Sequence, residues 1–202
     1  MTESVEAVRI GVLADTHIPH RLTRLPSGVI EIFKTSAVDL ILHAGDVDVS
    51  NCLEPLSQIA PVIAVRGNIH PQDFSRGGAE LPYHVELILR DRRLILTHGH
   101  RRGTLKFWVK FVIYGAYRLG LISREEINRR IVQDLHHRFP QADIIIFGHT
   151  HKPYQKWIDG TFFFNPGSVL KDGPQEPSVG ILTIEGDSIT TEFIPLFLDR
   201  GI

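Results

Sequence analysis

The chain has 202 residues, a net charge of −1, eleven histidines and one cysteine. This length suits a sizeable core, and we expect one domain over residues 1–202. The balanced charge argues against general nucleic-acid binding, for which a clearly basic surface is typical. The lone Cys52 rules out an internal disulfide framework, and the first residues carry two Glu and no signal-peptide core, so we expect a protein of the cytoplasm.

Short apolar runs rich in Val and Ile recur along the chain. Five of them have the length and composition of buried strands in an α/β fold: Val8–Ala14, Leu40–His43, Pro61–Val65, Leu94–Thr97 and Asp143–Phe147. Two further strands are predicted at Tyr83–Leu89 and Phe162–Phe164. The sequence Glu185-Gly186-Asp187-Ser188 predicts a hairpin that joins Val179–Ile184 to Ile189–Ile194.

Two short helical patterns lie in the first third of the chain. Val29, Ile30 and Phe33 share one face of a helix. A second helix around Leu56 must hold Pro55 in its first turn, where the missing N–H of proline costs no hydrogen bond. Both patterns alternate with the predicted strands, as expected of an α/β protein.

Two longer helical patterns follow the strand at Leu94–Thr97. The clearer one predicts a helix over Arg124–Phe139, because Ser123 and Glu126 have the spacing of a capping box. Before it, Leu105–Ile122 has the pattern of an amphipathic helix with a wide apolar face. Its three basic residues make it a poor membrane span, since each charge near a bilayer centre costs about 2.5–3.5 kcal/mol.

Six short polar motifs follow one another in the chain, and most of them end an apolar run. They are Asp15-Thr16-His17, Gly45-Asp46, Gly67-Asn68, His98-Gly99-His100, Gly148-His149-Thr150-His151 and Asn165-Pro166-Gly167-Ser168. Asp, Asn and His ligate metals through oxygen or imidazole nitrogen. A strand end holds such a ligand rigidly while the next loop leaves it open to substrate. Strand ends that converge on one point therefore predict a preformed site for two metal ions.

In this order, the motifs resemble the signature of the calcineurin-like metallophosphoesterase superfamily. The resemblance is closest to its small single-domain bacterial and archaeal phosphodiesterases, and it runs from Val8 to about Val169 with Arg101–Gln141 outside it. It implies a four-layer αββα sandwich, here with an inserted helical hairpin at about 101–141. It also implies a metal-dependent hydrolase of a small phosphodiester or nucleotide-like substrate.

The resemblance also implies a set of metal ligands. One ion would be held by Asp15, His17 and His151, the other by Asn68, His98 and His149, with Asp46 as the bridge. Carboxylate, amide and imidazole ligands without thiolate suit Mn²⁺, which we expect, and also Ni²⁺, Zn²⁺, Fe, Co²⁺ or Mg²⁺. Two ions about 3.5–4 Å apart polarise phosphoryl oxygens and turn a bridging water into a hydroxide that attacks phosphorus.

Each of these residues also has an ordinary structural interpretation. An Asp or Asn next to Gly is usually a turn or N-cap residue, and a single His at a strand end is usually hydrogen-bonded. Seven such residues in family order favour ligands. For His43, a partner of a ligand and a plain strand residue stay equally open, and His100 either contacts phosphate or caps the site. Arg66 either reaches a substrate oxyanion or pairs with a carboxylate, and the motif at Asn165 is interpreted as a structural turn.

One departure from the family bears on the leaving group. In the phosphomonoesterases the Asn ligand is usually followed by a His that protonates the leaving group. Here the run is Asn68-Ile69-His70. Ile69 cannot transfer a proton, so either His70 acts as a displaced general acid or the enzyme depends on a good leaving group. His70 and His100 are thus the candidate catalytic residues, and phosphodiesters are favoured over monoesters.

The segment Arg101–Gln141 has five basic residues and no acid in its first half. It follows His98 directly, so it could form a cationic lid for a nucleotide, a pyrophosphate or a lipid-linked phosphate. Alternatively, its apolar face packs on the domain or on a second subunit, and membrane-surface contact through 105–122 is a third role. A homodimer is expected only from the tendency of the small phosphodiesterases to associate.

Two other functions stay open for the same fold. One is a nucleotide or lipid-linked pyrophosphohydrolase, although that branch normally carries an Asn-His-Asp run. The other is a non-catalytic protein-binding scaffold like the retromer subunit of this superfamily. Such scaffolds tend to lose ligands, whereas all seven positions are filled here, which favours catalysis.

Overall fold

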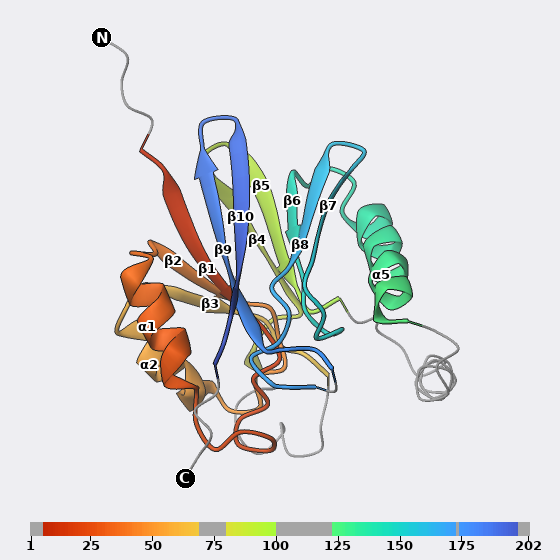
Figure 1. The fold of residues 1–202 in the computed structure, drawn as a ribbon. Coiled ribbons are helices and arrows are strands. Elements are labelled where there is room, and N and C mark those ends of the chain that lie inside the picture. Colours follow the sequence, from red (N-terminus) through yellow and green to blue (C-terminus); the bar gives the residue numbers. More distant parts are fainter. Residues whose placement is uncertain (1–5, 69–79, 100–122, 173, 198–202) are drawn as a thin grey trace.

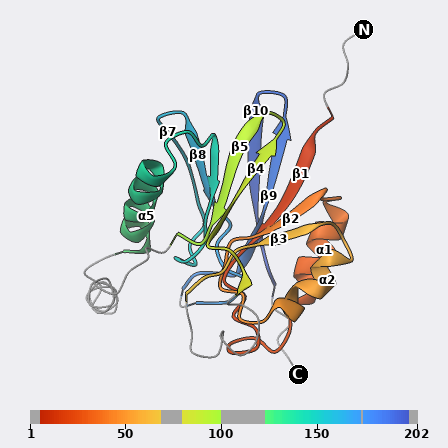
Figure 2. The same ribbon diagram turned by 180° about the vertical axis from the view of Figure 1, so that it is seen from behind.

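The computed structural model describes residues 6–68, 80–99, 123–172 and 174–197. Two five-stranded sheets lie face to face, with helices on their outer sides (Figure 1), and the view from behind shows the same layers (Figure 2). The described residues therefore form the four-layer αββα sandwich that the sequence predicts.

The first sheet has the strand order β10–β9–β1–β2–β3. Its strands are β1 (Val8–Leu13), β2 (Leu40–His43), β3 (Val62–Ala64), β9 (Ser178–Glu185) and β10 (Ser188–Pro195). Strands β1, β2 and β3 are parallel, with Ile10 opposite Leu40 and Ile41 opposite Val62. Strand β9 pairs antiparallel with β1 and with β10, and the hairpin turns at Gly186 as predicted.

The second sheet has the order β4–β5–β6–β8–β7. Its strands are β4 (His84–Leu89), β5 (Arg92–Thr97), β6 (Ile144–Ile146), β7 (Tyr154–Ile158) and β8 (Thr161–Asn165). The three central strands are parallel and both edge strands are antiparallel. The sequence does not predict β7, because this edge strand exposes its three middle residues and carries no apolar run.

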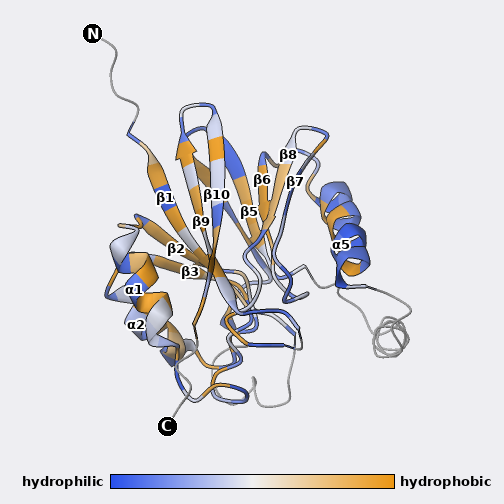
Figure 3. Ribbon diagram, in the orientation of Figure 1, coloured by the Kyte–Doolittle hydropathy of each residue, from blue (hydrophilic) through white to orange (hydrophobic). Residues whose placement is uncertain are grey.

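Helices cover the outside of each sheet. Helices α1 (Ser27–Thr35) and α2 (Glu54–Ser57), with the 3-10 turn η1 (Ser50–Leu53), lie on the first sheet, and α5 (Arg124–Arg138) lies on the second. Phe33 of α1 packs with Ile41, and Leu135 of α5 packs with Phe163. In Figure 3 the strands are largely hydrophobic, whereas α5 is mostly hydrophilic with an apolar stripe.

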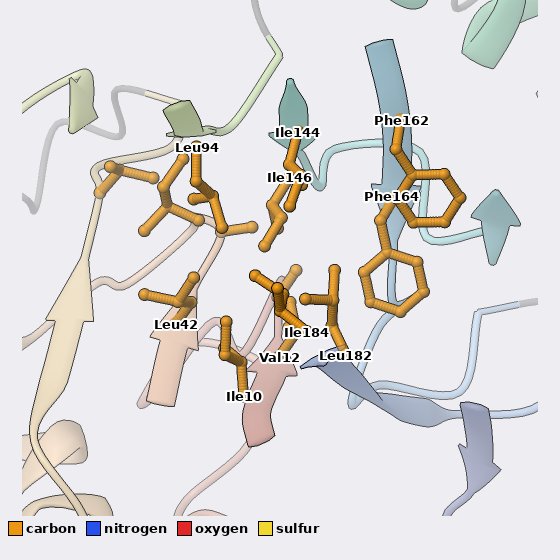
Figure 4. Packing of buried hydrophobic residues seen from close by; sticks show 14 residues of the cluster. Ile10, Val12, Leu42, Leu94, Ile144, Ile146, Phe162, Phe164, Leu182 and Ile184 are labelled. Carbon is orange, nitrogen blue, oxygen red and sulfur yellow. The ribbon is translucent and has the colours of Figure 1, made fainter. Parts of the chain in front are cut away.

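The main core fills the space between the two sheets. Figure 4 shows its side chains, contributed by Ile10, Val12, Leu42, Leu182 and Ile184 from the first sheet and by Leu94, Ile144, Ile146, Phe162 and Phe164 from the second. Each such fully buried side chain contributes about 1.5–3 kcal/mol of transfer free energy. This packing fixes the two sheets relative to each other, and with them the loops at their ends.

The predicted helix over Arg124–Phe139 is confirmed as α5, and the Ser123 hydroxyl accepts the capping hydrogen bond from the Glu126 amide at 3.1 Å. The predicted helix at 105–122, with its lid, membrane and dimer roles, lies outside the described residues. In the described part of the chain, no helix combines the length and apolar character needed to cross a lipid bilayer.

The parallel strands of the two sheets run in the same direction. The carboxyl ends of β1, β2, β3, β5 and β6 consequently converge, toward the lower centre of Figure 1. Polar side chains that follow these strands from distant parts of the sequence are brought to one edge of the sandwich. Ligands favour this edge of a sheet with parallel strands.

Candidate metal centre

All seven predicted ligands lie just after five strand ends at this edge. Asp15 and His17 follow β1, Asp46 follows β2, Asn68 follows β3, His98 follows β5, and His149 and His151 follow β6. Four of these residues, from three strands, form what we call the first cluster: Asp15, His17, Asp46 and His151. One ligand atom from each lies within 4.8 Å of those of the others, and all four residues are buried.

Two close contacts hold the first cluster together. The Nε2 atom of His17 is 3.1 Å from Oδ2 of Asp46. The Nε2 atom of His151 is 3.4 Å from Oδ1 of Asp15. Both imidazoles thus turn the same ring atom toward the two buried carboxylates.

Asn68, His98 and His149 form the second cluster. The Asn68 side-chain nitrogen is 3.3 Å from His98 Nε2 and 3.3 Å from His149 Nδ1, and those two ring nitrogens are 3.2 Å apart. The three side chains therefore direct one atom each to a common point. His149 does so through Nδ1, unlike the other three histidines.

Asp46 lies between the two clusters. Its Oδ2 faces His17, and its Oδ1 is 3.4 Å from Nε2 of His98. Oδ1 also accepts a hydrogen bond of 2.6 Å from the Asn68 backbone N–H. The Asn68 side-chain nitrogen is also 3.2 Å from Oδ2, so the Asp46 carboxylate contacts residues of both clusters.

These distances fit divalent metal ions. Nitrogen and oxygen ligands about 2.0–2.2 Å from one ion lie about 3.0–3.5 Å from each other in tetrahedral or octahedral geometry. The contacts within each cluster have this length. A half-turn of the Asn68 amide exchanges its nitrogen for its oxygen at the same point. The donor set of carboxylate, amide and imidazole is one that first-row divalent metals accept.

The backbone at the site adopts an uncommon conformation. Only a few per cent of non-glycine residues have positive φ, and such residues gather at functional sites. Among the described residues, nine non-glycine residues have positive φ. Five of these nine are predicted ligands: Asp15 (56°), His17 (46°), Asp46 (58°), His149 (76°) and His151 (58°).

Two glycines next to the ligands give them room. A Cβ atom on Gly67 would lie 1.8 Å from Oδ1 of Asp46. A Cβ atom on Gly45 would lie 2.5 Å from Nδ1 of His98, and this residue has a φ of +99°. The Gly-Asp and Gly-Asn motifs are therefore steric requirements of the site as well as turn signals.

Charge in the site is strongly coupled. Burial raises the pKa of Asp46, but the charge of His98 and a hydrogen bond with His17 outweigh it and hold this pKa well below its usual range. Burial lowers the pKa of His98, but Asp46 and then Asp15 outweigh it and raise this pKa to about 9. The carboxylates thus stay ionised and attract positive charge.

Comparison with known proteins agrees with this geometry. Residues 8–187 match the family described as the calcineurin-like phosphoesterase superfamily domain. Over 187 residues the chain is 33% identical to a probable metallophosphoesterase of Methanothermobacter thermautotrophicus, which covers 92% of this chain and 91% of that relative. This chain belongs to the calcineurin-like phosphoesterase superfamily.

A more distant sequence relative of this calcineurin-like phosphoesterase is an enzyme, and a solved structure with a similar fold is a sorting protein. The phosphodiesterase YfcE of Escherichia coli K12 is 28% identical over 172 residues, covering 76% of this chain and 77% of that one. A structure of vacuolar protein sorting 29 from Cryptosporidium parvum superposes with a TM-score of 0.68 at 21% identity, covering 95% and 92% of the two chains. That likeness shows the fold alone. The family makes this chain a hydrolase of phosphoric esters, and the buried Asp–His cluster supports metal dependence.

Other side chains support the ligands of the phosphoesterase. Nδ1 of His98 is 2.9 Å from the Ala44 carbonyl oxygen. His43 is fully buried, accepts a hydrogen bond from the Gly45 N–H at 3.3 Å and lies 3.1 Å from the Thr16 hydroxyl. Burial lowers the pKa of His43 to about 4. His43 therefore contacts the chain neighbours of the predicted ligands Asp15, His17 and Asp46, through Thr16 and Gly45.

The turn at Asn165-Pro166-Gly167-Ser168 supports the loop that holds His149 and His151. The Asn165 amide donates to the Gly148 carbonyl at 2.9 Å and to the Thr150 hydroxyl at 3.1 Å. The structural interpretation of this motif is therefore confirmed. Arg66 lies with its guanidinium 4.8 Å from the centre of the Tyr83 ring, in cation–π geometry. The predicted catalytic residues His70 and His100 lie outside the described residues.

Two carboxylates beside the site were missed in the sequence. Oδ1 of Asp48 is 3.9 Å from Nδ1 of His17, and its Oδ2 is 2.5 Å from Nδ1 of His20. Oδ2 of Asp172 is 2.8 Å from Nδ1 of His151. Asp48 follows Asp46 by two residues and could have been noticed from that spacing. Asp172 lies in no motif, and only the three-dimensional fold brings it to His151.

Proposed function

We propose that this phosphoesterase hydrolyses phosphodiesters with two divalent metal ions, Mn²⁺ being the expected pair. The observation that carries the proposal is the position of Asp46, whose two oxygens face two adjoining clusters of ligand atoms. Asp15, His17 and His151 would hold one ion with Asp46, and Asn68, His98 and His149 would hold the other with it. When bound, such ions supply Lewis-acid polarisation of the phosphoryl group and an acidified water as nucleophile.

The chain itself contributes orientation. Because the ligands follow rigid strand ends, the phosphate group would be held at the edge of the sandwich without rearrangement of the core. Buried Asp15 and Asp46 set the negative charge that offsets the charge of two divalent ions. The proton for the leaving oxygen would come from His70 or from water, since Ile69 has no proton to give.

The test is hydrolysis of bis(p-nitrophenyl) phosphate by metal-stripped protein as Mn²⁺ is added. We expect turnover that depends on Mn²⁺, exceeds that on p-nitrophenyl phosphate and disappears in Asp46→Ala. Asp187→Asn is the matched control, because this carboxylate is fully exposed on the β9–β10 turn. No turnover with any divalent ion, or equal turnover by Asp46→Ala, would contradict the proposal.

The role of His70 is tested by changing the leaving group. In the His70→Ala variant we expect diesters with poor leaving groups to slow more than nitrophenyl diesters, because only poor leaving groups need a proton. Equal slowing of both would remove His70 from the acid role and leave the proposed function intact.

A protein-binding scaffold is the alternative that the fold likeness to vacuolar protein sorting 29 raises. The presence of all seven ligand side chains in two clusters favours catalysis. Folded protein that binds no Mn²⁺ would favour the scaffold.

A further inference from the structure

His151 is held from both sides of its ring. Nε2 faces Asp15 in the first cluster, and Nδ1 lies 2.8 Å from Oδ2 of Asp172. The side chain of His151 is only 10% exposed. The contact with Asp172 is close in distance but not aligned as a hydrogen bond, so the negative charge of Asp172 is the property that acts on the ring.

Asp172 is held in turn by Arg124 at the start of α5. Nη2 of Arg124 lies 2.8 Å from Oδ2 of Asp172, the same oxygen that faces His151. Burial raises the pKa of Asp172, but the hydrogen bond and charge of Arg124 outweigh it and lower this pKa. The guanidinium of Arg124 thus holds the Asp172 carboxylate against the imidazole.

Arg124 also contacts the loop that carries His151. Its Nη1 donates to the Thr150 carbonyl oxygen at 3.2 Å. Its side chain is 14% exposed and that of Asp172 is 30% exposed, so this ion pair is less screened by water than a surface pair. One guanidinium therefore fixes both the backbone before His151 and the carboxylate behind it.

A carboxylate at Nδ1 determines how the imidazole can bind a metal. It favours the proton on Nδ1, which leaves the lone pair of Nε2 for the ion, and it makes that nitrogen a stronger donor. His151 has its Nε2 toward Asp15, as this arrangement requires. The three residues come from the first turn of α5, the loop after β6 and the loop after β8.

We propose that Asp172, fixed by Arg124, is the positioning residue that orients His151 as a ligand of the first cluster. This inference rests on the metal-binding part of the proposed function. It gives α5 a specific task, since the first residue of this helix helps to set the geometry of the metal centre.

The experiment measures Mn²⁺ binding to metal-stripped full-length protein by calorimetry. In Asp172→Asn, which keeps the size of the side chain and removes its charge, we expect the affinity of one ion to fall about 10–100-fold. The other ion should bind as in the wild type. Arg124→Gln should weaken the same ion by a smaller factor. Glu176→Gln is the matched control, because this carboxylate pairs with Lys171 in the same loop and is exposed.

A second readout separates orientation from general stability. In ¹⁵N NMR spectra of protein loaded with diamagnetic Zn²⁺, the wild type should show His151 bound through Nε2 with its proton on Nδ1, and this signature should weaken in Asp172→Asn. Without metal, Asp172→Asn should stay folded at the assay temperature and unfold in one cooperative transition like the wild type. Wild-type affinity for both ions in Asp172→Asn, or an equal loss in Glu176→Gln, would overturn the inference.

These outcomes are distinguishable from failure of the proposed function. If the wild type binds Mn²⁺ but cleaves no diester, the proposed activity fails while the effect of Asp172→Asn on affinity still tests the inference. If the wild type is active and Asp172→Asn binds both ions normally, the inference alone fails.

Discussion

The two clusters of the metal centre differ in the groups that surround their imidazoles. In the first cluster, His17 and His151 each turn Nδ1 toward a carboxylate, Asp48 at 3.9 Å and Asp172 at 2.8 Å. In the second cluster, Nδ1 of His98 faces the backbone carbonyl of Ala44. The first cluster also contains the carboxylate of Asp15, whereas the second contains the neutral amide of Asn68. The first is therefore the more anionic half.

This difference suggests a division of labour. Ligands with a negative net charge and electron-rich imidazoles, as in the first cluster, bind a divalent ion tightly. Nearly neutral ligands that share one carboxylate, as in the second cluster, bind it more weakly. We infer that the first cluster would bind a divalent ion more tightly than the second.

Removal of one predicted ligand from each cluster tests the difference in metal affinity most directly. In Asp15→Asn, the affinity for the more tightly bound ion should fall more than about 100-fold. This loss exceeds the one expected when a supporting residue such as Asp172 is changed. In Asn68→Ala, the tightest ion should be kept and only the weaker one lost. Competition with a chelator measures both. Equal loss of the tightest ion in the two variants would show that the clusters do not differ.

The buried His43 below the first cluster should make stability depend on pH. Its pKa is about 4 in the folded chain because of burial, against about 6.5 when unfolded. As pH falls below about 6.5 the unfolded chain takes up the proton first, so stability present above that pH is lost progressively down to about pH 4. Between about pH 7.5 and pH 5, the metal-stripped wild type should lose about 2 kcal/mol more than His43→Gln.

Urea unfolding at the two pH values measures this difference. Comparison with the variant cancels the opposite contributions of His17 and His98, whose pKa values are raised in the fold although burial alone would lower them. The same loss in wild type and variant would show that His43 is not held neutral.

The smallest expected effect concerns proton release at the second cluster. Because His98 has a pKa of about 9 in the metal-free fold, it must lose a proton to bind an ion near neutral pH. The affinity of the weaker ion should rise about tenfold per pH unit between about pH 7 and pH 8.5. Calorimetry in buffers of different ionisation enthalpy counts the released proton. A pH-independent affinity in this range would show that His98 does not lose a proton when the ion binds.

The sequence predicts the buried part of this molecule well. Strands such as β2 and β6 are continuous apolar runs, and the capping box of α5 is a local signal that tertiary contacts do not override. The ligand motifs are visible because each follows such a run. Strand β7 is missed because an edge strand needs no apolar run, and its backbone pairs with β8 whatever its side chains.

The surroundings of the site are harder to foresee. Arg124, His151 and Asp172 are far apart in sequence, and no spacing rule joins them. The shared role of the two Asp46 oxygens depends on the register between β2 and its neighbours, which the sequence leaves open. Sequence patterns thus predict which residues are candidate ligands, whereas the packing of the sheets decides which of these residues lie together.

The left-handed backbone of five predicted ligands has a consequence for the stability of the fold. Glycine adopts this conformation freely, while other residues hold it at a cost of about 1–3 kcal/mol each. The chain therefore holds its donor side chains at a cost that glycine would avoid, at Asp15, His17, Asp46, His149 and His151. The backbone is thus least relaxed where the chemistry of the site lies, at the expense of the stability of the fold.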